Sequence, residues 1–179
     1  MWRALCTLGL FLLILTGCDE DSAGPAPKQC TGGAVKWLNG HCYDAVLAPG
    51  LSWDEAQAAC VDRGGYLATI TSAEENTFVF SLVSGDSAFW YLDAFDNGLG
   101  PWLGGYQTLG SPPDEGWQWV TGEPFVYTNW ETGQPGDLIG TDQNRLRFFK
   151  QGALVGDRWD DCEPDNPLAH RRGYVFESD

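Results

Sequence analysis

Two segments in the first half of the chain carry the spacing of apolar residues that is typical of amphipathic helices. The first reads SWDEAQAACVDRGG, residues 52–65. Its apolar side chains recur on one helical face: Trp53, Ala56, Ala59 and Cys60. Ser52 and Glu55 have the spacing of a capping box, and Gly64 follows as a stop signal. The second segment, SAEENTFVFSLV, residues 72–83, repeats the capping signal with Ser72 and Glu75.

The helical spacing stops near Ser84, and short alternating segments follow it. Three of them are predicted strands: Trp117–Val120, Arg145–Phe149 and Gly173–Glu177. The connections between them are long and rich in Gly, Pro, Asp and Asn, which is typical of functional loops. Two helices followed by strands and loops predict an α+β fold.

The most apolar run of the chain lies at its N-terminus and predicts export. Arg3 precedes LGLFLLILTG, residues 8–17, which has the length of a signal-peptide core and is too short for a transmembrane helix. The run ends in LTGC, which resembles the bacterial lipobox, so residues 1–17 are interpreted as a lipoprotein signal peptide and Cys18 as the lipidated residue. An ordinary secretory signal is the alternative.

A polar segment separates this signal from the rest of the chain. Residues 18–29 include DEDSAGPAPKQ, whose Pro, Gly and Ala content indicates a flexible tether. Residues 30–179 remain for one folded module. We therefore expect a module held at a membrane by an N-terminal lipid, in a bacterial cell envelope or at a cell surface.

Composition and charge narrow the classes of partner. The chain is 43% hydrophobic and has nine tryptophans, enough apolar material for a core. Its formal net charge of −15 argues against nucleic acids and anionic membrane surfaces as partners. The same charge is compatible with hard cations, which prefer oxygen ligands.

Export also bears on the cysteines, because secreted proteins meet oxidising conditions. Of six cysteines, Cys6 belongs to the signal and Cys18 would carry the lipid, which leaves four in the module: Cys30, Cys42, Cys60 and Cys162. Sequence alone does not fix their connectivity.

The most suggestive polar motif is Trp159-Asp160-Asp161. Adjacent acids can form a solvated turn, half of a carboxylate pair for acid–base catalysis, or part of a metal site. Asp160 with Glu163 would be such a pair for glycoside hydrolysis, but no second acid lies in an apolar segment that would raise its pKa. We therefore favour a protein that is not an enzyme.

Six segments, in this order, resemble the C-type lectin domain family: CTGGAVKWLNGHCY, SWDEAQAACVDRGGYLATITSAEEN, PWLGGY, GWQWVTGEPFVYTNW, GQPGD and RWDDC. Together they span nearly all of residues 30–177. The resemblance implies an α+β, C-type lectin-like fold with two helices, two small antiparallel sheets and a long loop region. It also implies a Ca²⁺ ion in that loop region, which in turn ligates sugar hydroxyls.

The resemblance implies the ligands residue by residue. Gln134 and Pro135 match the family's loop motif, with the proline expected in cis. Gly136 replaces the family's Asn or Asp, and an acid follows only at Asp137. Trp130, beside this loop, is a candidate contact for the sugar, together with Gln134, Asp137 and Asp160.

Further ligands are implied near the third and fourth strands of the family. Asp142 and Gln143 compete for one position: charge favours the former and alignment to the strand the latter. Asp160 and Asp161 are implied metal ligands, and Trp159 a core residue. The expected role of the two adjacent aspartates is therefore to bind a metal ion.

The resemblance also implies a bridge between Cys30 and Cys42. The family's partners of Cys60 and Cys162 are absent here, because Phe176 takes one position and no cysteine stands near Asn144. Those two cysteines either pair with each other or stay reduced.

These observations predict a calcium-dependent, carbohydrate-binding module on a membrane-tethered exported protein. Its expected partners are a glycan and the membrane, the latter only through the lipid, with a protein partner possible and nucleic acid excluded. The alternative is a metal-independent protein-interaction module on the same fold. The sequence does not identify the sugar.

Overall fold

The computed structural model describes residues 29–136, 142–164 and 170–179, so the predicted signal, most of the tether, Cys18 and Asp137 lie outside the described residues. Helix α1 spans Trp53–Asp62 and helix α2 spans Ala73–Ser81, as predicted. In the part of the chain that is described, no helix is long and apolar enough to cross a membrane.

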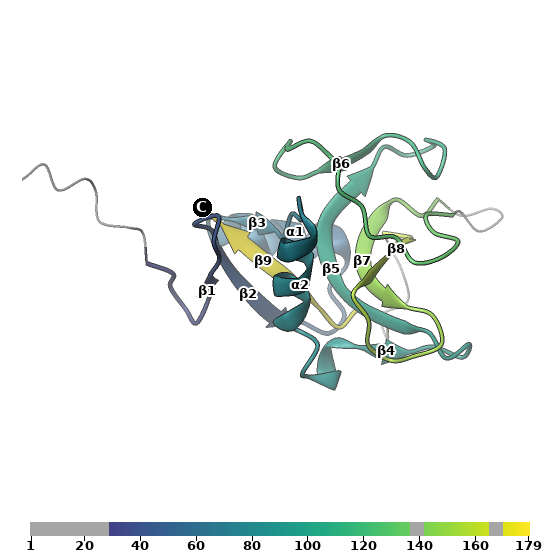
Figure 1. Ribbon diagram of the computed structural model, residues 1–179, viewed down its shortest axis with the longest axis horizontal. Helices are drawn as coiled ribbons and strands as arrows, with labels where there is room; N and C mark the ends of the chain where they lie inside the picture. Colours follow the sequence, from purple (N-terminus) through teal and green to yellow (C-terminus); the bar gives the residue numbers. More distant parts are fainter. Residues whose placement is uncertain (1–28, 137–141, 165–169) are drawn as a thin grey trace, which may run out of the picture.

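The strands form one sheet made of two antiparallel groups (Figure 1). Its strands are β1 (Val35–Lys36), β2 (Cys42–Leu47), β3 (Tyr66–Leu67), β4 (Tyr91–Leu92), β5 (Gly98–Gln107), β6 (Trp117–Trp119), β7 (Arg145–Lys150), β8 (Arg158–Cys162) and β9 (Gly173–Ser178). The hydrogen-bonded order is β1-β2-β9-β5-β7-β8, with β3 beside β9 and with β4 and β6 beside β5. The two groups meet where Trp102 of β5 pairs with Tyr174 of β9 in parallel. This is the predicted α+β, C-type lectin-like architecture.

The capping signals act differently in the two helices. At α1, Ser52 and Glu55 form the full reciprocal capping box. At α2, Ser72 accepts from the Glu75 backbone N–H, but the Glu75 side chain is buried and accepts from the backbone N–H of Thr71 at 2.6 Å. The second acid therefore joins the interior polar groups while the helix still begins at the predicted place.

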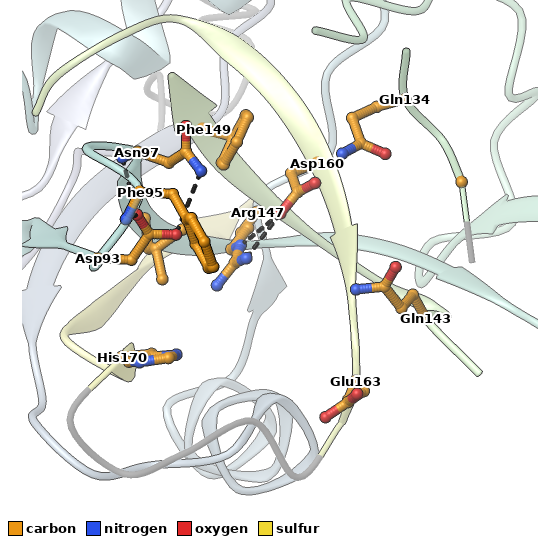
Figure 2. A pocket seen from close by; sticks show the side chains of 12 residues that line it. Asp93, Phe95, Asn97, Gln134, Gln143, Arg147, Phe149, Asp160, Glu163 and His170 are labelled. Atoms are coloured by element: carbon orange, nitrogen blue, oxygen red, sulfur yellow. Dashed lines mark hydrogen bonds and ion pairs between the residues drawn. The ribbon is translucent and has the colours of Figure 1, made fainter. Parts of the chain in front are cut away.

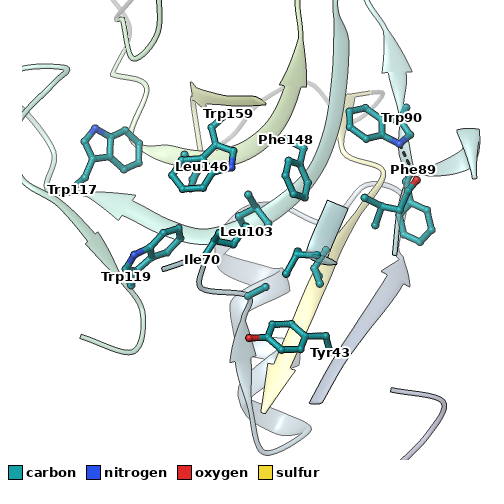
Figure 3. Packing of buried hydrophobic residues seen from close by; sticks show 14 residues of the cluster. Tyr43, Ile70, Phe89, Trp90, Leu103, Trp117, Trp119, Leu146, Phe148 and Trp159 are labelled. Atoms are coloured by element: carbon teal, nitrogen blue, oxygen red, sulfur yellow. Dashed lines mark hydrogen bonds between the residues drawn. The ribbon is translucent and has the colours of Figure 1, made fainter. Parts of the chain in front are cut away.

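An aromatic core lies between α2 and the β5–β7–β8 strands (Figure 3). Its largest fully buried side chains include Trp90, Trp119, Trp159 and Phe148. Trp159 fulfils its predicted core role, and its indole Nε1 donates to Asn76 Oδ1 on α2 at 2.8 Å. Buried indoles require such acceptors, so this bond fixes α2 relative to β8.

The longest strand, β5, was not predicted as a strand, because its glycines and proline indicated a loop. Its glycines allow close packing instead. A Cβ on Gly100 would come within 2.7 Å of the Trp90 ring, and one on Gly105 within 2.6 Å of Leu146. Glycine is needed here for tertiary contacts that local propensity does not report.

Cys30 and Cys42 form the disulfide that the resemblance implies. Cys60 and Cys162 are buried in a second core cluster, and neither is disulfide-bonded. Burial raises the pKa of the Cys60 thiol to about 12, which keeps it protonated. The open question about this pair is therefore answered in favour of two thiols.

A buried carboxylate, Glu177 of β9, organises a polar cluster between β2 and β3. It is 1% exposed. It accepts from the Thr69 backbone N–H at 2.7 Å and lies 2.6 Å from His41 Nδ1 and 2.8 Å from the Tyr43 hydroxyl. Burial lowers the pKa of His41, but the hydrogen bond to Glu177 and the charges of the nearby carboxylates together outweigh burial, so this pKa stands above its ordinary value.

Candidate functional site

A cleft of about 360 Å³ opens where the β7–β8 pair meets the loops (Figure 2). The turn at residues 93–97, the loop around Gln134 and the two strands contribute its walls. Its lining residues are Asp93, Phe95, Asn97, Leu99, Gln134, Gly136, Gln143, Arg147, Phe149, Asp160, Glu163 and His170. Gln134, Gln143 and Asp160 of the predicted site are thus brought together.

An ion pair between Arg147 and Asp160 lies in one wall of the cleft. The two residues are direct partners in the antiparallel register of β7 and β8. Asp160 Oδ2 accepts from Arg147 Nε at 3.0 Å and from Nη2 at 2.6 Å, and the side chains are only 5% and 7% exposed. Burial raises the pKa of Asp160 above its ordinary value, against the opposing effect of the guanidinium. Arginine keeps its proton in proteins, and its two hydrogen bonds to Asp160 Oδ2 favour the charged form of this carboxylate.

Asp161 points to the loop that carries Gln134. It is fully buried, and both of its carboxylate oxygens accept from the Gly136 backbone N–H at 3.0 Å. This contact holds the loop, whose Gln134–Pro135 peptide bond is cis as expected, against β8. Asp161 thus positions the loop backbone.

Of the other predicted ligands, Asp142 lies away from the cleft, whereas Gln134 and Gln143 line it. Asp142 Oδ2 accepts from the Gly110 backbone N–H at 2.7 Å and does not line the cleft, whereas Gln143 does. Gln134 Oε1 is buried and has no hydrogen-bond partner among the described residues. Of the two candidates for one ligand position, Gln143 thus lies at the cleft and Asp142 does not, and the ligand itself stays a prediction.

Trp130, the predicted sugar contact, packs into the interior. Its ring lies 4.9 Å from that of Trp117 and 5.9 Å from that of Trp159, between ring centroids. The residue also forms an isolated bridge with Trp159. The residue is partly buried, and its ring packs against other aromatic rings, away from the cleft lining.

Of the two phenylalanines that line the cleft, Phe149 is buried and Phe95 is exposed, and sequence reasoning missed Phe95. Asp93 Oδ1 accepts from the backbone N–H groups of Phe95 and Asn97, each at 2.8 Å, which forms a turn. The turn leaves Phe95 82% exposed. The sequence signal for this residue was a phenylalanine between two acids, Asp93 and Asp96, that favour a turn.

The described residues do not fit the calcium site that the resemblance implies. Asp160 is neutralised by Arg147, and Gly136 supplies no side-chain oxygen. Among the residues that the structure describes, no three His, Cys, Asp or Glu side chains form a cluster that could hold a metal ion. A divalent cation beside Asp160 would also be repelled by the buried guanidinium. Among the described residues that line the cleft, Gln134 Oε1 is the buried acceptor without a hydrogen-bond partner.

Acid–base chemistry has no support in this arrangement. A general acid needs a carboxyl group that can hold a proton at working pH and release it to the substrate. Asp160, one member of the pair considered for glycoside hydrolysis, is bound to a guanidinium in the strand register. The cleft instead offers hydrogen-bonding groups beside an exposed ring, which is an arrangement for binding.

Comparison with known proteins agrees with the fold. The sequence profile described as Lectin C-type domain matches residues 50–140. The chain belongs to the C-type lectin domain family. Regenerating islet-derived protein 3-alpha of Mus musculus is 33% identical over 170 residues, which cover 93% of this chain and 89% of that protein. An alpha-N-acetylgalactosamine-specific lectin of Patiria pectinifera is 29% identical over 176 residues, covering 94% of each.

Solved structures of C-type lectin folds resemble this one. The carbohydrate-recognition domain of the mouse scavenger receptor C-type lectin has a TM-score of 0.62 at 19% identity, covering 84% of this chain and 96% of that one. A calcium-independent type II antifreeze protein has a TM-score of 0.59 at 24% identity, covering 84% and 94%. At these identities the likeness establishes the fold alone. Membership of a lectin family supports the prediction that the chain is not an enzyme.

Proposed function

We propose that this chain is a lectin, a non-catalytic module that binds a glycan in the cleft between the β7–β8 pair and the turn at residues 93–97. Family membership supports the proposal, and one relative is named for its specificity toward alpha-N-acetylgalactosamine. The cleft also lies beside the Gln134–Gly136 loop, where the resemblance places sugar binding.

One observation carries the proposal: polar groups and an exposed aromatic ring border the same small cleft. Arg147, Asp160 and Asn97 present donors and acceptors, and Phe95 presents a ring. A sugar offers hydroxyl groups to the first and an apolar C–H face to the second. Small-molecule sites combine a few fixed polar groups with apolar walls in this way.

A printed array of neutral and sialylated glycans, probed with the purified protein in calcium buffer, tests this function. We expect reproducible binding to a group of glycans that share a terminal sugar, with competition by that free sugar. An array with no binding above background would reject the lectin proposal. It would favour the alternative, a protein-interaction module on the same fold.

Whether glycan binding depends on calcium is a separate question from whether the chain binds a glycan. The unpartnered Gln134 Oε1 favours a cation at the loop, and Asp137, the acid nearest in sequence, lies outside the described residues. The Arg147–Asp160 pair opposes a cation. Calcium-dependent and calcium-independent glycan binding are therefore the two alternatives that the experiments must distinguish.

Display on a membrane is a further part of the proposal and rests on the sequence alone. LTGC, residues 15–18, supports lipidation of Cys18, with residues 1–17 removed. We expect Cys18→Ser to release the full chain from the membrane fraction of a bacterial host, with Cys60→Ser as the matched cysteine control. Unchanged membrane association of Cys18→Ser would reject the lipid anchor.

A further inference from the structure

We propose that the Arg147 guanidinium takes the place of a metal ion in this cleft, so that the protein binds a neutral sugar without calcium. The inference rests on the proposed lectin function and names its ligand class and its mode of recognition. Three features of the described residues lead to it: the engagement of the guanidinium, the charge of the cleft and the position of Phe95.

The guanidinium is built into the cleft as a permanent cation. Nε and Nη2 of Arg147 bind Asp160, and the third nitrogen, Nη1, points away from that carboxylate (Figure 2). The β7–β8 register fixes both partners, and both are buried. Arg147 therefore neutralises the family's ligand position and leaves the amino group of Nη1, with two N–H bonds, to donate to sugar hydroxyls.

The charge around the guanidinium selects neutral ligands. Asp93, Asp160 and Glu163 line the cleft against the single charge of Arg147. His170 does not restore the balance, because burial, together with repulsion from Arg147, lowers its pKa. An anionic sugar, such as a sialic acid, would meet net repulsion. A neutral sugar could instead accept from Arg147 and donate to the carboxylates.

Phe95 supplies the apolar half of the recognition. It is 82% exposed, although its backbone is held in the turn by Asp93. Because the turn already fixes the backbone, only the two side-chain torsions of Phe95 lose freedom when a ligand covers the ring. The C–H face of a pyranose can cover the ring while its hydroxyls reach Arg147 and Asn97, both of which line the same cleft.

The decisive experiment repeats the array of neutral and sialylated glycans in EDTA and in calcium. We expect the same neutral glycans to bind with equal strength in both buffers, and the sialylated counterparts to bind more weakly. Phe95→Ala should weaken binding roughly five- to tenfold, the range of an aromatic contact. Leu38→Ala removes another highly exposed apolar side chain outside the cleft and should leave binding unchanged.

Each outcome decides the inference. Binding in calcium that disappears in EDTA would overturn metal independence but preserve the lectin proposal. Binding to no glycan in either buffer would overturn both. Equal binding in both buffers with full retention by Phe95→Ala would overturn the placement of the sugar. Because Phe95 is exposed, its replacement leaves folding intact, which thermal unfolding of the variant verifies.

Discussion

Asp160 and Glu177 are both buried carboxylates, yet the protein stabilises them by different means. Asp160 faces a guanidinium across the β7–β8 pair. Glu177 is surrounded by hydrogen-bonding groups of Thr69, Tyr43 and His41. An arginine supplies a fixed charge, whereas His41 changes charge near neutral pH. The Arg147–Asp160 pair is therefore fixed in charge and closed to a second cation, whereas the cluster around Glu177 responds to pH.

The largest effect is expected when Asp160 is removed. Asp160→Ala leaves the Arg147 guanidinium buried without a counter-charge, which should lower the free energy of unfolding by about 3–5 kcal/mol. Urea denaturation measures the loss. Asp54→Ala is the matched control. Asp54 pairs with Arg145 but its side chain is 64% exposed, so the free energy of unfolding should fall by less than about 1 kcal/mol. Equal losses in the two variants would mean that the Arg147–Asp160 pair is not a buried ion pair.

A smaller effect is expected at Glu177. Glu177→Gln keeps the shape but turns a carboxylate that accepts from several donors into an amide that is half donor. We expect a loss of about 1–3 kcal/mol in the free energy of unfolding, measured by urea denaturation. Glu115→Gln, at an exposed position, is the control and should be near neutral. If Glu177→Gln left the free energy of unfolding unchanged, the charge of this carboxylate would contribute nothing to stability.

The pH dependence sharpens the comparison further. His41 has a pKa above its ordinary 6.5 in the folded protein. Its contribution to stability is therefore complete below pH 6.5 and is lost as the pH rises through the folded-state pKa. The wild type should lose stability relative to His41→Gln across that interval. A difference between the two proteins that is constant with pH would contradict the His41–Glu177 contact.

Much of the fold follows from local signals. The Ser52–Glu55 capping box places α1, and the order of six family segments predicts the α+β architecture. The strand β5 escaped prediction because its glycines serve tertiary contacts: Gly100 admits the Trp90 ring and Gly105 admits Leu146. Such a need depends on side chains distant in the sequence, so no local pattern contains it.

The candidate site was predictable only in part, for a similar reason. The sequence identifies Asp160 and Asp161, and alternation places Arg145 and Arg147 on one face of a strand. Only the strand register shows that Arg147 lies opposite Asp160. Trp130 borders the loop in sequence, but burial among aromatic rings determines where it lies. The resemblance to the family thus locates the loop of the candidate site. The pairing of β7 with β8 determines which charged groups lie beside that loop.

The most direct test of the central claim is thermal unfolding of the wild type in EDTA and in about 10 mM CaCl2, with equal MgCl2 as the ionic control. A calcium site with a Kd of about 0.1 mM would stabilise the protein by about 2.7 kcal/mol under these conditions. For a domain of this size, that corresponds to a rise in Tm of roughly 5–10 °C. Because Arg147 already neutralises Asp160, the account predicts the same Tm in all three buffers. A rise specific to calcium and reversed by EDTA would contradict it.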